Sequence, residues 1–200
     1  MTERSEVHVT SELTPEQRAE VLERHLHEHG HVHPEAIDEA VAAGERGDGP
    51  STALGARIVA RAWTDPDYKA RLLDDATTTI SETAQQTIPI AVLEDTESVH
   101  HVIVCTLCSC YPSAVLGAPP SWYKSFEYRS RVVREPRSVL AEFGMDVPAG
   151  VELRVVDSTS EQRYLVLPMR PDGTEGWSQE DLAALVTRDS MVGTGRPLTP

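Results

Sequence analysis

Residues 88–106 have the sequence IPIAVLEDTESVHHVIVCT. Two runs rich in β-branched side chains are separated by a short polar turn, and this composition is typical of buried strands. The chain before this stretch has mostly helical patterns, whereas the chain after it mixes strands and helices without regular alternation. We therefore predict an α+β fold in which a helical N-terminal arm and linker, residues 1–49, precede a mixed α/β/β/α layered domain, residues 50–200.

Capping signals and apolar spacing predict where the helices lie. A helix is expected over residues 14–30, because Thr14 can cap it, Pro15 suits its first turn and Gln17 completes a capping box. A second short helix is expected over residues 34–43, before the linker GERGDGP. Further helices are predicted over residues 54–63, 67–82, 122–144 with a new start at Pro136, and 178–191 with Ser178 as cap.

Two more β-branched segments flank the polar turn DSTSE. They are VELRVVDS, residues 151–158, and QRYLVLPM, residues 162–169. Two such segments joined by a short polar turn are typical of neighbouring antiparallel strands. The sequence therefore predicts a β-hairpin here.

The charge balance limits the classes of partner. The chain has 32 acidic and 18 basic side chains and a net charge of -14, which argues against electrostatic binding to nucleic acid or an anionic membrane. The first residues, MTERSEVHVTSE, lack the apolar segment of a secretory signal, and no run approaches the roughly 20 apolar residues that span a bilayer. We expect a cytoplasmic protein, and we interpret the aromatic and basic stretch 122–137 as a subunit interface rather than an RNA site.

All three cysteines lie within six residues of the segment VCTLCSCYP, at Cys105, Cys108 and Cys110. An odd number of closely spaced cysteines argues against a secreted disulfide framework. The C-x-x-C spacing lets two thiolates bind one metal from a tight turn, and Cys110 adds a third sulfur. Structural zinc needs a fourth ligand, which would have to come from a more distant residue such as His100 or His101.

Ser109 alone separates the last two cysteines. This spacing brings the backbone nitrogens of Ser109 and Cys110 towards any metal that the sulfurs hold. Amide nitrogen binds a metal only when it is deprotonated, so soft sulfur and amide nitrogen together favour an oxidised transition metal with one open position. Zinc and a redox turn without metal are the alternatives.

The cysteine segment and the motifs after it resemble the alpha subunit of nitrile hydratase. The resemblance is carried by VCTLCSC with YP, LG, PP and WYKS after it, and then by YRSRVVREPRSVLAEFG, DSTSEQRYLVLPMRP, GTEG and LVTRDSM. It covers residues 50–200 closely and the arm loosely. It implies a lyase that hydrates a nitrile to the amide at one low-spin trivalent metal per chain. Thr106 is typical of the non-corrin cobalt(III) type, whereas the iron type has serine there, so cobalt is expected rather than iron.

The resemblance also assigns roles to residues of the claw, as we call residues 105–110. It implies that Cys105 stays a thiolate, that Cys108 becomes a sulfinate and that Cys110 becomes a sulfenate. The metal acts as Lewis acid on a nitrile or a water, and the Cys110 oxygen is the nucleophile or the base. Ser109 contributes its amide nitrogen and its hydroxyl group. The family positions that support and orient the claw correspond here to Asp157, Glu161 and Arg163.

The implied charge of the claw predicts partners. Trivalent cobalt with three sulfurs and two deprotonated amides has a formal charge of about minus two, and a buried charge requires cations. In the family, arginines of a beta subunit supply them, so an obligate beta subunit is expected, together with an activator protein that delivers cobalt. Within this chain, Arg163 is the arginine expected to reach the claw.

Residues Ser113 and Ala114 depart from the family, which usually has Trp-Pro after CSCYP. Loss of an indole opens on the order of a hundred Å² of apolar contact. We therefore place Ser113 and Trp122 in a substrate pocket for a bulky or heteroaromatic nitrile, such as the nucleoside-like substrate of the hydratase that acts on toyocamycin. The partner chain filling the gap is the alternative.

Two other functions are alternatives to nitrile hydration. The related thiocyanate hydrolase has arginine at the position of Ser113, where a cation would meet an anionic substrate. The claw could also belong to a metal-binding or redox module without catalysis. A histidine run, at His25, His27, His29, His31 and His33, is either a divalent-metal site used in cobalt loading or a solvated helix end.

Overall fold

The computed structural model describes residues 14–30, 52–83 and 88–200. Contacts between residues divide the chain into two compact units, residues 1–49 and 50–200. In the first unit, helix α1 (Pro15–Glu28) begins with the predicted capping box, in which Thr14 and Gln17 exchange backbone-to-side-chain hydrogen bonds. The helix predicted over residues 34–43 lies outside the described residues.

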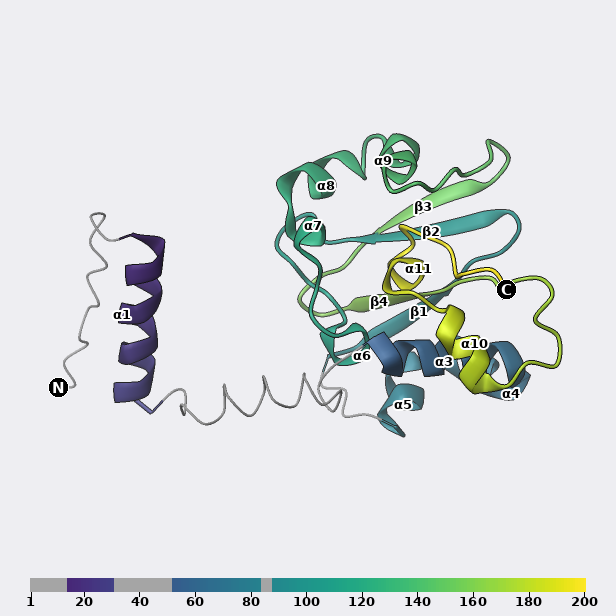
Figure 1. Ribbon diagram of the computed structural model, residues 1–200, viewed down its shortest axis with the longest axis horizontal. Coiled ribbons are helices and arrows are strands. Elements are labelled where there is room, and N and C mark those ends of the chain that lie inside the picture. The colour runs from purple at the N-terminus through teal and green to yellow at the C-terminus, as the bar shows by residue number, and fades with distance from the viewer. Residues whose placement is uncertain (1–13, 31–51, 84–87) are drawn as a thin grey trace. The chain divides into compact units, whose positions relative to one another are not determined.

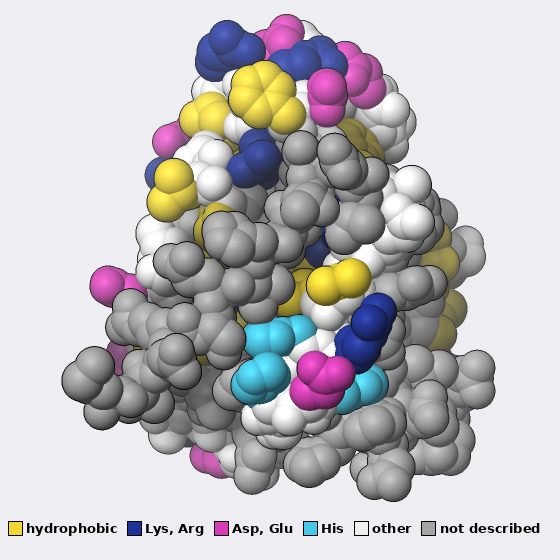
Figure 2. All heavy atoms as spheres, turned by 90° about the vertical axis from the view of Figure 1, so that its left-hand side faces the viewer, with side chains coloured by type: hydrophobic (Ala, Val, Ile, Leu, Met, Phe, Trp, Pro, Cys, Tyr) yellow, Lys and Arg dark blue, Asp and Glu magenta, His cyan; other side chains and the backbone are white. Residues whose placement is uncertain are grey.

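Histidine side chains gather on the molecular face that Figure 2 shows. On α1, the ring centroids of His25 and His29 lie 4.1 Å apart, and His29 Nδ1 lies 2.8 Å from the carbonyl oxygen of His25. His31 and His33 lie outside the described residues. The metal-loading role of this run stays a prediction.

The second unit is layered, as Figure 1 shows. One side consists of α3 (Thr52–Thr64), α4 (Pro66–Asp74), α5 (Ala76–Ser81), α6 (Ser113–Leu116) and α10 (Gln179–Leu185). The strands are β1 (Ile90–Glu94), β2 (Val99–Val104), β3 (Glu152–Asp157) and β4 (Arg163–Leu167). Beyond β3 lie α8 (Phe126–Arg131) and α9 (Pro136–Glu142), with the short α7 (Ser121–Lys124) before them, and α11 (Arg188–Val192) packs between β2 and β4. This arrangement confirms the predicted α+β layered class.

Three of the predicted helices are divided further. The stretch before Pro136 is split at Ser125 into α7 and α8. The segment 67–82 breaks at Asp75, whose non-helical backbone ends α4 while its carboxylate accepts a hydrogen bond from Thr78 N at the start of α5. Ser178 caps α10 as predicted, but the backbone turns extended at Val186, and Thr187 caps α11. Side chains that accept a hydrogen bond from a backbone N–H group favour the start of a new helix over continuation of the preceding one.

The predicted hairpin is wrong. The strands β3 and β4 belong to different two-stranded sheets, in which β3 pairs with β2 and β4 pairs with β1, both in parallel. Five residues, 158–162, carry the chain between the sheets: Ser158 N still donates to Val104 O of one sheet, and Arg163 N already donates to Pro89 O of the other. A short polar turn does not determine which strands pair. The consecutive buried apolar residues at the ends of β2 (102–104) and β4 (165–167) are the pattern of strands covered on both faces, as in parallel sheets.

The parallel pairing decides where the claw lies. The last residues of β2, Val102 to Val104, are fully buried, and the claw begins at the next residue, Cys105. In register, Val104 lies opposite Asp157, the last residue of β3. Parallel strands end at the same edge of a sheet, so the claw and the residues after β3 meet at this edge.

Candidate metal centre

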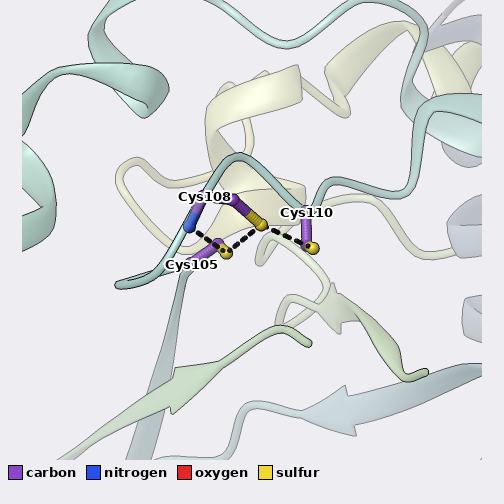
Figure 3. A group of neighbouring side chains, drawn as sticks. All are labelled: Cys105, Cys108 and Cys110. Carbon is purple, nitrogen blue, oxygen red and sulfur yellow. Dashed lines mark hydrogen bonds between the residues drawn. The ribbon is translucent and has the colours of Figure 1, made fainter. Parts of the chain in front are cut away.

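The three cysteine sulfurs converge on one side of the claw (Figure 3). The Sγ atom of Cys108 lies 3.4 Å from that of Cys105 and 3.1 Å from that of Cys110, and all three lie within 4.8 Å of one another. The cysteines are free thiols, and Cys105 and Cys110 are buried whereas Cys108 is exposed. Three thiols held together without a disulfide are a donor set that fits a metal ion.

The thiols differ in acidity because their surroundings differ. Hydrogen bonds from the Cys110 and Cys105 thiols and from the Ser109 amide lower the pKa of Cys108 to about 7. Burial and the hydrogen bond with Cys108 raise the pKa of Cys110 to about 12, against the attraction of Arg163. Cys108 therefore becomes a thiolate at lower pH than Cys110, and thiolate is the form that binds metal.

Tyrosine hydroxyl groups fix the chain on both sides of the claw. Tyr128, on α8, donates to the carbonyl oxygen of Ile103 at 2.7 Å, and Tyr123, on α7, donates to that of Cys110 at 2.9 Å. Both tyrosines are buried, and burial raises the pKa of each hydroxyl group, which keeps both as neutral donors. Because each anchor lies 13 or more residues away in sequence, the cysteine motif alone could not identify them.

Asp157 and Arg129 hold the peptide groups at the start of the claw. The Asp157 carboxylate accepts hydrogen bonds from Thr106 N at 2.9 Å and from Thr106 Oγ1 at 2.5 Å. Arg129 Nη1 lies 3.1 Å from Cys108 O and 3.4 Å from Thr106 O, and its Nε donates to Ser125 O. Asp157 was predicted from the sequence, whereas Arg129 was missed, because in the sequence it is only one member of a basic stretch.

A cavity of about 360 Å³ opens beside the last two cysteines. Ser109, Ser113 and Arg163 are among the residues that line it. The Nε and Nη1 atoms of Arg163 are buried and have no hydrogen-bond partner within the described part of the chain. A partly buried guanidinium with two buried, unpaired donor atoms at the wall of a cavity can bind an anion or an acceptor placed there.

Two predicted site residues lie elsewhere. Trp122 packs edge to face against Tyr128 and Phe143, with ring centroids 4.9 and 4.8 Å apart, and is not among the residues that line the cavity. Glu161 is exposed, and its backbone N–H donates to Thr159 Oγ1 at 3.3 Å.

His100 and His101, the candidate zinc ligands, are engaged with other groups. The His100 Nδ1 atom lies 2.6 Å from an Asp95 carboxylate oxygen, and its Nε2 atom lies 2.8 Å from Gly193 O. His101 Nδ1 lies 3.1 Å from the same carboxylate. Among the described residues, the group of potential metal ligands found at the claw contains the three cysteines and no histidine.

Two arginines of the basic stretch 122–137 are engaged with groups of their own chain. Arg131 forms ion pairs with Glu135 and Glu142, and Arg137 donates to the carbonyl oxygen of Val147. Arginines that bind their own chain are not available for phosphates. The interpretation of residues 122–137 as a subunit interface stays a prediction.

Comparison with known proteins gives the family. The model of the family described as nitrile hydratase, alpha chain, matches residues 13–195. The chain belongs to this family. It is 54% identical over 187 residues to a nitrile hydratase subunit alpha from a Rhodococcus species, with 92% of this chain and 93% of that one covered. It is 50% identical over 194 residues to the cobalt-containing nitrile hydratase subunit alpha of Pseudonocardia thermophila, with 95% and 93% covered.

Solved structures of both metal types agree with the fold. An Fe-type nitrile hydratase double mutant from Comamonas testosteroni Ni1 is 40% identical with a TM-score of 0.85, over 92% of this chain and 91% of that one. A recombinant thiocyanate hydrolase with partially modified cobalt centres is 37% identical with a TM-score of 0.81, over 93% of this chain and 91% of that one. In sequence, the match to thiocyanate hydrolase subunit gamma of Thiobacillus thioparus is less complete, at 45% identity over 156 residues, 71% of this chain and 64% of that one.

Membership of the nitrile hydratase alpha-chain family confirms three of the predictions. The chain is a subunit of a nitrile-hydrating enzyme, its cysteine cluster suits a metal, and a beta subunit is its partner. In the described part of the chain, no helix has the length and apolarity needed to cross a membrane.

Proposed function

We propose that this chain is the alpha subunit of a cobalt(III) nitrile hydratase, with residues 50–200 as its catalytic domain. The sulfur atoms of Cys105, Cys108 and Cys110 and the backbone nitrogens of Ser109 and Cys110 are the ligands. The convergence of three free thiols in one loop is the observation that carries the proposal. An activator protein for cobalt delivery and a cytoplasmic location belong to the same proposal.

The surroundings of the claw disfavour zinc. Both histidines considered as a fourth zinc ligand are engaged with Asp95. Cobalt is chosen over iron because of Thr106 and the cobalt-containing relative.

The reaction needs a base or nucleophile beside a polarised nitrile. The bound metal supplies the Lewis-acid polarisation. Oxidised Cys110, as sulfenate, presents its oxygen to the cavity, where it attacks the nitrile carbon or takes a proton from the attacking water. Oxidised Cys108, as sulfinate, remains a negatively charged ligand. Addition of one water to the nitrile gives the amide.

Arg163 supplies a cation to the oxidised claw from within the chain. Burial raises the pKa of the Cys110 thiol, the attraction of Arg163 opposes this rise, and two donors of the guanidinium are free within the described residues. Asp157 orients the claw through Thr106, and Glu161, which is exposed, is proposed to support the claw as the matching family position does. Arginines of the beta subunit complete the neutralisation, as buried anions require.

The substrate is proposed to be a bulky or heteroaromatic nitrile. Ser113 and Ala114 line the cavity next to the claw, and neither fills space as an indole would. Thiocyanate is the second candidate substrate, but Ser113 supplies no cation at the position where that enzyme has arginine. The less complete match to the hydrolase also favours the hydratase.

The test is the mass and metal content of the claw in the αβ complex made with cobalt. Tryptic cleavage after Arg71 and Lys124 gives a peptide of residues 72–124 that contains all three cysteines. Three added oxygens, one tightly held cobalt and amide formation from an aromatic nitrile are expected. Three plain thiols with exchangeable zinc would instead support the module without catalysis, and turnover of thiocyanate alone would support the hydrolase.

A further inference from the structure

Arg129 contacts the backbone of the claw and none of its sulfurs. Its Nη1 atom lies 3.1 Å from the carbonyl oxygen of Cys108. That oxygen belongs to the peptide group whose nitrogen is the Ser109 amide. The same Nη1 atom lies 3.4 Å from the carbonyl oxygen of Thr106, so one guanidinium spans both ends of the first turn of the claw.

The electronic structure of the peptide group gives this contact a chemical meaning. Oxygen and nitrogen of one peptide share their π electrons, which is why the bond between carbon and nitrogen is planar and partly double. A peptide nitrogen that binds metal without its proton therefore places part of its negative charge on its own carbonyl oxygen. A cationic donor at that oxygen forms a charge-assisted hydrogen bond, about twice as strong as one between neutral groups.

We infer that Arg129 is a positioning residue that stabilises the Cys108–Ser109 peptide as a negatively charged metal ligand. This inference rests on the proposed function, because it requires the Ser109 nitrogen to be a ligand. Arg129 thus acts on the backbone of the claw, whereas Arg163 lines the cavity beside its sulfurs. The neutralising charge proposed for the claw comes partly from its own chain.

The surrounding helix fixes the Arg129 side chain in place. Ser125 caps α8 through a hydrogen bond from Tyr128 N to its hydroxyl group, and its carbonyl oxygen accepts from Arg129 Nε at 3.4 Å. Tyr128, one residue earlier, anchors Ile103 just before the claw. The same short helix therefore holds the strand that enters the claw and the guanidinium that contacts it.

A matched control is available nearby. Arg134 carries the same charge a few residues further along, is exposed, and donates through Nε to Ser130 O, and among the described residues no contact between it and the claw is found. The substitutions are Arg129→Met, which removes the charge, Arg129→Lys, which keeps it, and Arg134→Met as control. Each variant is made as the full αβ complex with cobalt.

Two readouts report on the ligand field rather than on turnover. The first is the rate at which cobalt is lost to a chelator, and the second is the position of the sulfur-to-cobalt charge-transfer absorption band. We expect Arg129→Met to lose cobalt on the order of tenfold faster, with a shifted band, since it removes a hydrogen bond to a charged group. Arg129→Lys should lie within about threefold of the wild-type rate, since the charge is kept. Arg134→Met should match wild type in both readouts.

The inference is overturned if Arg129→Met matches the control, or if Arg129→Lys is as impaired as Arg129→Met. If Arg129→Met does not assemble with its partner, Arg129→Gln takes its place, because it keeps an uncharged N–H donor. The glutamine variant must then lose cobalt faster than the lysine variant, and equal rates overturn the inference. Failure of the proposed function is distinguishable, because the wild-type complex itself would then contain no firmly held cobalt and no added oxygens.

Discussion

The carboxylate of Asp157 accepts two hydrogen bonds from Thr106, one from the backbone N–H and one from the hydroxyl group. The residue before the claw, Val104, lies opposite Asp157 in the parallel ladder, so the contact is a result of strand register. The hydroxyl group of Thr106 is therefore committed to the carboxylate. Its effect on the metal is exerted through the order of the loop.

Removing the Thr106 hydroxyl group should weaken metal retention. Thr106→Val keeps the side-chain shape but removes one hydrogen bond, which is worth about 1 kcal/mol or about a fivefold change in an equilibrium constant. We expect this variant to retain cobalt less well in a chelator competition, whereas Thr106→Ser, which keeps the hydroxyl group, should match wild type. Equal cobalt retention by the valine and serine variants would contradict a role for the hydroxyl group.

The order in which the thiols react tests the electrostatics of the metal-free claw. Hydrogen bonds from Cys110, Cys105 and the Ser109 amide lower the pKa of Cys108 to about 7, and burial is the main cause that raises that of Cys110 to about 12. Only the thiolate is nucleophilic, so alkylation of Cys108 should rise through about pH 7 and level off above it.

Mass spectrometry of the peptide 72–124 after brief treatment with iodoacetamide measures this order. A single modification at Cys108 is expected at pH 8, with Cys110 unmodified. Unfolded chain in urea is the control, because all three thiols should then titrate near the ordinary cysteine value of about 8.5. Simultaneous modification of Cys108 and Cys110 in the folded protein would show that the claw does not hold the thiols as described.

The cysteine spacing was sufficient to predict the claw but not the side chains that hold it. Three cysteines within six residues are a local pattern, and their convergence is a result of the tight turn. The contacts of Arg129 and Tyr123 with the claw join residues 13 to 23 positions apart and depend on how the chain returns after α6. The partner of Asp157 depends on strand pairing, and the hairpin prediction failed because strand pairing is not a local property.

A buried acid in the turn between β1 and β2, Asp95, is predicted to stabilise the fold. The Asp95 carboxylate accepts from His101 N at 2.8 Å and contacts the Nδ1 atoms of His100 and His101. Burial raises its pKa, but the hydrogen bonds from His100 and His101 outweigh burial and the net shift is downward. Because the folded pKa is depressed, this stabilisation is present above the unfolded pKa of about 3.9 and is lost as pH falls through the folded value.

The substitution Asp95→Asn tests that role. It should reduce the free energy of unfolding at pH 7 by about 1–3 kcal/mol, since one buried imidazole loses its acceptor. The urea midpoint of the cobalt-loaded complex measures the loss, and the difference from wild type should stay constant down to about pH 4 and shrink as the pH falls below that value. Glu97→Gln, at an exposed position in the same turn, is the control. If the stability difference between wild type and Asp95→Asn grew towards acid pH, the pKa of Asp95 could not be depressed in the folded protein.

The size of the cavity predicts how one substitution changes substrate preference. Ser113 is exposed at the cavity wall, next to buried Pro112 and exposed Ala114. Ser113→Trp would place an indole of about 200 Å² at this wall and should exclude bulky nitriles while adding contact to small ones. The ratio of kcat/KM for a small aliphatic nitrile to that for a heteroaromatic nitrile should rise by about tenfold or more, as one excluded group is worth about 1–3 kcal/mol.

Ser113→Ala is the matched control, because it removes the hydroxyl group without filling the cavity. Its substrate ratio should stay close to the wild-type value, while cobalt content and cysteine oxidation should be unchanged in both variants. An unchanged ratio in Ser113→Trp with cobalt fully bound would mean that a side chain of the beta subunit already occupies this space. The bulky-substrate proposal would then be wrong, although the metal centre, which depends on the cysteines and their anchors, would be unaffected.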